Sequence, residues 1–284
     1  MPASAVTSGT KVITANGSYD VTEFKNVSVI IGNFASISPI DGLSYVDGLP
    51  NDWNRIKEIA KIISETSESI NVNTTGSVYV NNGNTWAYKI TPGNTISITS
   101  QIGTYAYAVM GFNNFVLANR GNYGGGHATA GLTFGAVDCI MKDNINLANS
   151  SGGGWGESRI RTTGMSVLKL GMPDTLAQVK VPYVIKDNPN TIVYSDDYMF
   201  LPAEKEVFGI DSHSITAEAN ALTQFAYYKN GGSKIKSLSG SAVHWWLRSV
   251  GNYLSGSFCG VNTLGGAFES GASNTYGVAP CFCV

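Results

Sequence analysis

Apolar and polar side chains alternate along this chain with two different periods. From Trp53 onward apolar residues recur at helical spacing, at 56, 60 and 63, and Pro50 and Asp52 before them are residue types that open helices. Between 77 and 120 the period changes to two, and Trp86 and Tyr88 alternate with smaller or polar residues after a turn-like Asn-Asn-Gly. The pattern therefore predicts a helix within 49–66 that is followed by β-strands.

Three further segments have helical patterns before the chain returns to strands. They span 155–170, 172–180 and 216–228, while residues 240–284 are again β-like. Helices and strands do not alternate as β-α-β units, and the sequence contains no repeat of fixed period. This arrangement predicts an α+β fold.

The N-terminal region is expected to form a unit of its own. Residues 9–31 have the pattern of short β segments joined at Asn16-Gly17, a strong turn dipeptide. An isolated hairpin of this size cannot bury a core, so we expect it to pack against copies of itself or a partner. We divide the chain into a β segment for assembly or attachment (1–38), a linker with the first helix (39–75) and the main domain (76–284).

Composition and charge narrow the classes of partner. The chain has 284 residues, with 18 Lys and Arg against 20 Asp and Glu, a net charge of −2 and only 13% charged residues. Such a surface lacks the positive charge that nucleic-acid binding requires and the basic cluster that an anionic membrane attracts. No apolar run approaches the roughly 18 residues of a bilayer span. We therefore expect no nucleic-acid partner and no membrane insertion.

The N-terminus and the cysteines indicate where the protein is made. Residues 1–18 contain neither a basic n-region nor a long apolar h-region, so we expect no signal peptide and synthesis in a cytoplasm. The four cysteines, at 139, 259, 281 and 283, are then expected to stay reduced.

Residue types of catalytic sites occur in patterns that do not support catalysis. Asp211-Ser212-His213 contains the three residue types of a hydrolase triad, but consecutive residues cannot converge in the required geometry. We interpret it as a turn. The glycine-rich stretch 121–131 lacks the Lys and Ser/Thr that complete a phosphate-binding loop, and it is predicted to be a surface loop. We therefore expect a protein that is not an enzyme.

Metal-binding patterns are weak as well. Cys281 and Cys283 share one face of a predicted strand, but neither paired cysteine knuckles nor histidines at helical spacing accompany them, as structural zinc requires. The sequence has no calcium loop of the EF-hand type. Because a free cysteine most often behaves as a small buried apolar residue, we expect core thiols, no metal and no cofactor.

Several motifs resemble a known family. HWWLRS (244–249), FCGVN (258–262) and GVAPCFCV (277–284) resemble the C-terminal signature of a domain family of unknown function from gut bacteria and their phages. Upstream stretches such as GFNNFVLA, GGGWGESRIR and MFLPAEKEVFG recur in the family's order, so the resemblance covers about 76–284. The chain departs from the pattern at Val250, where proline is usual, and at Ala279, where arginine is common.

That family is similar to C-type-lectin-like domains, in the branch of formylglycine-generating enzymes and of the variable proteins of diversity-generating retroelements. In those variable proteins a frame with W-x-R holds a rewritten segment that forms the ligand-binding face. The resemblance thus implies a C-type-lectin-like fold with Trp245, Trp246 and Arg248 as frame, and 250–276, rich in Asn, Ser, Tyr and Gly, as face. The ligand would contact Asn252, Tyr253, Leu254, Ser257, Gly260, Asn262, Leu264, Phe268, Glu269 and Tyr276.

The resemblance also implies a function in binding. TANGSYDVTEFKNVSV near the N-terminus resembles the openings of many phage tail proteins. This implies a receptor-binding protein of the virion that contacts other tail components and a host cell-surface protein or glycan, as a homo-oligomer for which we expect a trimer.

Alternatives to this interpretation stay open. One is a bacterial surface or cargo-binding module without diversification. Another is an oxidase like the formylglycine generators, for which Cys281 and Cys283 are the only plausible copper donors, although their i, i+2 spacing does not resemble that family's active-site pair. The segment 250–276 is also compatible with an ordinary loop and edge strand.

Overall fold

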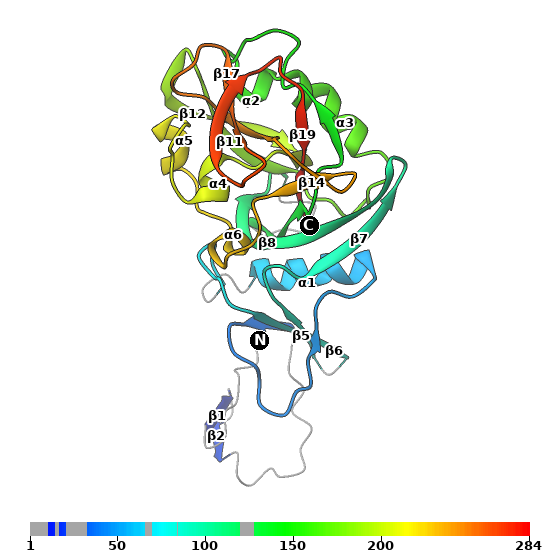
Figure 1. The fold of residues 1–284 in the computed structure, drawn as a ribbon. Coiled ribbons are helices and arrows are strands. Elements are labelled where there is room, and N and C mark those ends of the chain that lie inside the picture. The colour runs from blue at the N-terminus through cyan, green and yellow to red at the C-terminus, as the bar shows by residue number, and fades with distance from the viewer. Residues whose placement is uncertain (1–10, 15–16, 21–32, 66–69, 84, 120–127) are drawn as a thin grey trace.

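The structure is a computed structural model that describes residues 11–14, 17–20, 33–65, 70–83, 85–119 and 128–284 (Figure 1). Strands account for 41% of the residues and helices for 17%, so the protein is mainly β and the α+β prediction is wrong. Most predicted helices shrink to single turns because contacts with neighbouring strands, rather than a continuous apolar stripe, hold each turn in place.

The helical segments show how the prediction failed. The first helix is confirmed as α1 (Trp53–Glu65). The segment 155–170 breaks into three short pieces, and 216–228 breaks into two, whereas 172–180 contains no helix. These pieces and one further helix are α2 (Gly154–Glu157), the π-helical η3 (Ile160–Gly164), α3 (Met165–Leu168), α4 (Glu204–Phe208), α5 (Thr216–Asn220) and α6 (Ala226–Lys229).

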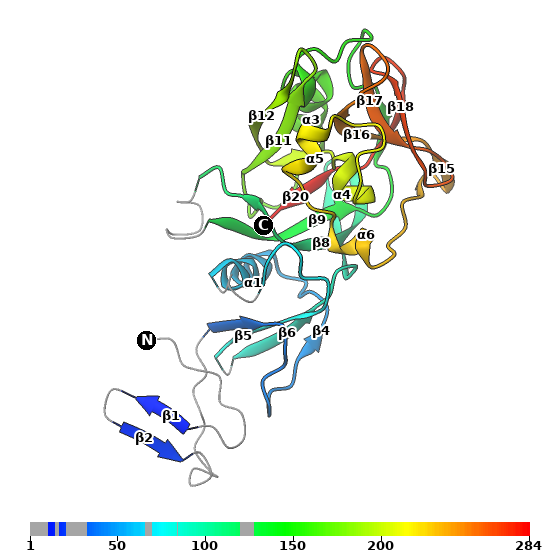
Figure 2. The same cartoon turned by 90° about the vertical axis from the view of Figure 1, so that its left-hand side faces the viewer.

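Helix α1 lies between two sheets (Figures 1 and 2). Asp52 caps its start by accepting a hydrogen bond from the Asn54 amide at 3.0 Å, and its isoleucines fill the space between the sheets. On one side it packs against a four-stranded sheet ordered β3-β5-β6-β4. The bounds are Asn33–Ser36, Val78–Asn82, Trp86–Ile90 and Val46–Asp47.

This four-stranded sheet joins parts of the chain that the sequence analysis separated. β3 lies in the predicted N-terminal segment and β4 in the predicted linker, yet they pair with β5 and β6 of the predicted main domain. The boundaries expected at 38 and 75 are therefore both crossed by backbone pairing. The hairpin of β1 (Lys11–Thr14) and β2 (Gly17–Asp20) forms a two-stranded sheet of its own and does not pair with the four-stranded sheet. The rest of the N-terminal prediction, and residues 121–127 of the glycine-rich stretch, lie outside the described residues.

On its other side α1 packs against the central sheet, ordered β13-β20-β9-β8-β7. The strands are Met199–Phe200, Cys281–Cys283, Thr129–Ala136, Gly103–Val116 and Thr95–Ser100. Gly131 in β9 allows the close approach, because a Cβ there would stand 1.9 Å from the Ala60 carbonyl oxygen of α1. The ring of Trp53 completes the contact against Phe134 and Phe282.

A second five-stranded sheet carries the C-terminal motifs and is called the C-terminal sheet below. Its order is β10-β19-β16-β17-β18, with bounds Met141–Asp143, Tyr276–Val278, Trp245–Val250, Ser257–Val261 and Ala267–Gly271. Both views place it at the end of the molecule opposite β5 and β6. Two hairpins, β11 (Val179–Ile185) with β12 (Asn188–Asp197) and β14 (Lys236–Leu238) with β15 (Ser241–Val243), complete the strands. Among the described residues no helix is long and apolar enough to cross a membrane.

Candidate ligand-binding face

The WWLRS motif forms β16, inside the C-terminal sheet. Trp245 and Trp246 are adjacent and therefore point to opposite sides of the strand, and both are fully buried. The indole of Trp245 donates to the Lys234 carbonyl at 2.9 Å and that of Trp246 to the Asp143 carbonyl at 3.0 Å. The motif thus fixes β16 by burial on both faces together with one hydrogen bond from each indole.

Arg248 is also fully buried, and its partner is Glu206 of α4. The guanidinium donates two hydrogen bonds to the Glu206 carboxylate, at 2.6 and 2.7 Å, and further bonds to the carbonyls of Leu201 and Pro182. Burial lowers the pKa of Arg248, but Glu206 more than offsets this, so the net pKa lies above its ordinary value. The residue therefore ties β16 to α4 and β11 as a charged pair.

The loop after β16 is the most exposed part of the predicted face. We call residues 251–256 the binding loop. Asn252 is exposed, Tyr253 is 70% exposed and Leu254 is 52% exposed. Exposed aromatic and aliphatic side chains next to one another on a loop are typical of contact surfaces.

The backbone of the binding loop is held from several sides. Glu269 of β18 accepts hydrogen bonds from the amides of Tyr253 and Leu254, at 3.3 and 3.1 Å, and from the Ser257 hydroxyl at 3.0 Å. Lys186 donates to the carbonyls of Gly251 and Asn252. The side chains therefore project from a backbone that hydrogen bonds already hold in position.

The other end of β17 carries a second exposed apolar tip. Leu264 is 87% exposed at the turn between β17 and β18. Asn262 holds this turn, because its side-chain oxygen accepts the amides of Leu264 and Gly266 at 2.9 and 3.0 Å. Of these two predicted contact residues, Leu264 is available to a ligand and Asn262 shapes the turn.

Phe268 and Tyr276 belong to a half-buried aromatic group. With His244 and Trp246 they form what we call the aromatic cluster, in which ring centres lie 4.8 to 5.6 Å apart. Phe268 lies opposite Gly260, so its ring covers the space that a side chain at 260 would fill. Phe268 and Glu269 are neighbours on β18 and point to opposite faces of the sheet, so the structure does not bring all ten candidates together.

Two candidates are excluded from direct contact with a ligand. Ser257 and Gly260 are buried in β17. Sequence reasoning also missed three residues around the face: Lys186, His213 and His244. His213 lies edge-on against Tyr253, with ring centres 6.1 Å apart; a turn was predicted at Asp211-Ser212-His213, and the backbone bends at 212–213. Lys186 and His213 come from segments distant in sequence, so no local pattern could identify them, whereas His244 directly precedes β16 in the HWWLRS motif.

The cysteines lie in the core, as predicted. All four are free and buried. Burial raises the pKa of every thiol, to about 12 for Cys139 and Cys283. Among the described residues no group of three or more histidine, cysteine or acidic side chains is arranged to hold a metal ion.

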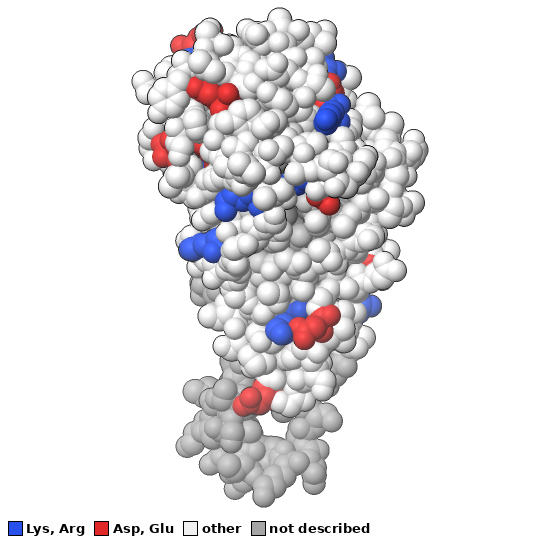
Figure 3. Space-filling view, viewed as in Figure 1, with Lys and Arg blue, Asp and Glu red and all other residues white. Residues whose placement is uncertain are grey.

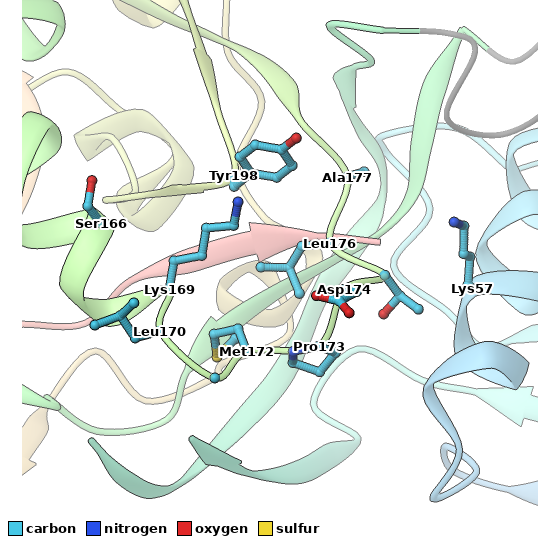
Figure 4. A pocket seen from close by; sticks show the side chains of 12 residues that line it. Lys57, Ser166, Lys169, Leu170, Met172, Pro173, Asp174, Leu176, Ala177 and Tyr198 are labelled. Atoms are coloured by element: carbon cyan, nitrogen blue, oxygen red, sulfur yellow. The ribbon is translucent and has the colours of Figure 1, made fainter. Parts of the chain in front are cut away.

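A cavity of about 640 Å³ lies elsewhere, between α1 and the segment 166–177 (Figure 4). Its lining is mostly polar, but Lys169 points to the ring of Tyr198, 3.4 Å from its centre, and Ser166 donates to the Thr162 carbonyl. Lys57 reaches the cavity from α1 on the other side. None of the ten candidates lines it, so it is separate from the face described above.

Comparison with known proteins gives one match. Residues 168–284 match a family described as a domain of unknown function (DUF6273). The match covers less than half of the chain, but it contains β16, the binding loop and the aromatic cluster. No curated protein and no solved structure matches the chain.

Proposed function

We propose that the protein is a receptor-binding protein whose ligand contacts the binding loop and the turn at Leu264. The observation that carries the proposal is the difference in solvent exposure between a strand of the C-terminal sheet and the loops next to it. The frame at 245–250 is buried, whereas Tyr253, Leu254 and Leu264 project into solvent from backbone that hydrogen bonds hold in place. Large apolar side chains that are held in solvent at two loops of one sheet favour a contact surface.

The surroundings of the two loops support binding to a largely uncharged partner surface. A neighbouring loop that carries the 78% exposed Leu147 packs beside the binding loop, where Gly256 approaches the Asn149 carbonyl. Charged side chains on the face drawn in Figure 3 are few and of both signs. A host cell-surface protein or an uncharged glycan fits this chemistry, and the motif resemblance favours a phage tail protein that works as a trimer beside other tail components.

A bacterial surface module without diversification would use the same loops. The neighbouring DNA distinguishes the two: a reverse transcriptase gene and a near-copy of the 3′ end that differs at adenines would establish diversification, and their absence would leave the surface module. The oxidase alternative is disfavoured, because Cys281 and Cys283 are buried and their pKa values are raised by burial.

The binding proposal is tested by attachment of the labelled protein to a panel of bacterial cells. The triple variant Tyr253→Ser, Leu254→Ser and Leu264→Ser should reduce attachment about 10-fold or more, since exposed aromatic and aliphatic anchors carry most binding energy. A matched control is Tyr194→Ser with Leu170→Ser, which are similarly exposed at 58% and 49% but lie outside the face. Equal attachment of the triple variant and the wild type, with both variants folded, would contradict the proposal.

A further inference from the structure

Three carboxylates are buried near the segment that supports the binding loop, and two of them, Glu206 and Glu218, interact with Arg248. Glu204, Glu206 and Glu218 are at most 2% exposed, and Arg248 is fully buried. Glu206 accepts the two hydrogen bonds that the guanidinium donates to a carboxylate, and within the described part of the chain no Lys or Arg forms an ion pair with Glu204 or Glu218. Burying charges of one sign together is costly, which makes their protonation states structurally important.

Glu204 connects this cluster to the binding loop. Its carboxylate accepts the amides of His213 and Ser214, at 3.0 and 2.7 Å. The His213 carbonyl in turn accepts the Asn252 amide at 2.7 Å, and Ser214 forms a β-bridge with Gly251. The His213 ring also packs against Tyr253. One buried carboxylate therefore holds the segment on which the exposed loop rests.

Glu218 of α5 lies near enough to Glu204 for the charge of one carboxylate to act on the other. Its Oε1 is buried without a hydrogen-bond partner. Burial raises its pKa to about 7; Arg248 and Ser249 lower it, and Glu206 and Glu204 raise it further. The Ser249 hydroxyl accepts a hydrogen bond from the backbone amide of Glu204 at 2.9 Å, and it also bonds to the Glu218 carboxylate. Both residues therefore contact the same side chain. Cys259 lies beside both carboxylates, and its thiol stays neutral because burial raises its pKa.

We propose that Glu204 is a positioning residue for the binding loop, and that the proton on Glu218 controls how firmly Glu204 holds it. With Glu218 protonated, Arg248 faces the Glu206 carboxylate, and the contacts of Glu204 to His213 and Ser214 are undisturbed. When Glu218 loses its proton, the added negative charge repels Glu204 in a low-dielectric site. The segment 213–214 and the loop then loosen, and binding weakens as pH rises through about 7. The consequence for binding rests on the proposed function, whereas the coupling between proton and loop does not.

The coupling is tested without any ligand, by NMR of the ¹³C,¹⁵N-labelled full chain from pH 5.5 to 8.5. The amides of His213, Ser214, Asn252 and Tyr253 should shift with one common midpoint near 7. The side-chain carboxyl carbon of Glu218 should titrate with the same midpoint. A Glu218 carboxyl that titrates at its ordinary value, or loop amides with unrelated midpoints, would overturn the proposal even if no variant folds.

Two variants distinguish a titration of Glu218 from a titration of His213, which lies in the segment that the loop contacts. Glu218→Gln keeps the shape and should abolish the common titration of the loop amides, while His213→Gln should leave the Asn252 shift in place. The reverse result would assign the titration to His213 and overturn the proposal. Glu204→Gln should lower hydrogen-exchange protection of the Ser214 and Asn252 amides at every pH, and unchanged protection would remove Glu204 as the positioning residue.

Cell attachment of the wild type should then weaken about 5-fold or more between pH 6 and 8, a size typical of coupled sites, and Glu218→Gln should bind equally at both. If the loop amides and Glu218 titrate together but the protein attaches to no cells at any pH, the proposed function is refuted and the coupling is not. Attachment that is independent of pH, with no common titration, would refute only the coupling.

Discussion

The ion pair of Arg248 and Glu206 shows how strongly the free energy of unfolding can depend on a single buried residue. Replacing Arg248 by Met leaves the Glu206 carboxylate 2% exposed and without its cation. We expect a loss of about 3–5 kcal/mol in the free energy of unfolding, measured by urea denaturation. The control is Asp196→Asn, which breaks the exposed pair with Lys180 and should cost about 1 kcal/mol or less. Similar losses for both variants would contradict this role.

A second prediction at the scale of a single residue concerns Glu218 and how the free energy of unfolding depends on pH. The pKa of Glu218 is about 7 in the folded protein and about 4.5 when the residue is exposed. Between pH 4.5 and 7 the folded state therefore keeps a proton on Glu218 that the unfolded state has released. The free energy of unfolding should therefore fall as pH rises from 4.5 to 7, by up to roughly 3 kcal/mol from this group, and level off above.

The variant Glu218→Gln removes this contribution. Thermal melts should show it to be more stable than the wild type at pH 8 and about equal at pH 4.5. Glu157→Gln replaces an exposed carboxylate and serves as the control, with no comparable trend. A constant difference between Glu218→Gln and the wild type across this range would place the ionisation of Glu218 outside the window.

At the scale of elements, the contact between α1 and β9 depends on one glycine. Gly131→Ala places a methyl group against the Ala60 carbonyl, which is backbone and cannot turn aside. The helix must shift, and we expect a loss of about 1–3 kcal/mol from overpacking, measured by thermal or urea unfolding. Gly76→Ala is the control, since nothing lies within 4 Å of the added atom there. A stable Gly131→Ala variant would show that α1 can move on the sheet.

At the scale of the whole molecule, one core extends from Ala35 to Val284, and the four cysteines lie in it. A thiol reagent should therefore label none of them in the native protein and all four once the protein unfolds. The labelling rate should follow the unfolding rate as denaturant is added. Rapid labelling of Cys281 or Cys283 in the native state would favour the oxidase alternative.

The sequence by itself determined the local features. Helical spacing after Asp52 predicted α1, alternation at 86–90 predicted β6, and the apolar character of the cysteines predicted core thiols. Each of these signals reports on the faces of one segment, and periodicity carries that information. The same reasoning overestimated helix, because a short apolar run that packs against a sheet has no stripe long enough to define its structure.

Tertiary structure alone decided which residues face one another. Arg248 and Glu206 are 42 residues apart, and nothing in either segment specifies the other. The pairing of β3 with β5 across the expected domain boundary, and the burial of Ser257 and Gly260 within the predicted face, depend on neighbouring strands in the same way. Such contacts arise from the packing of elements distant in sequence, so no local pattern could predict them.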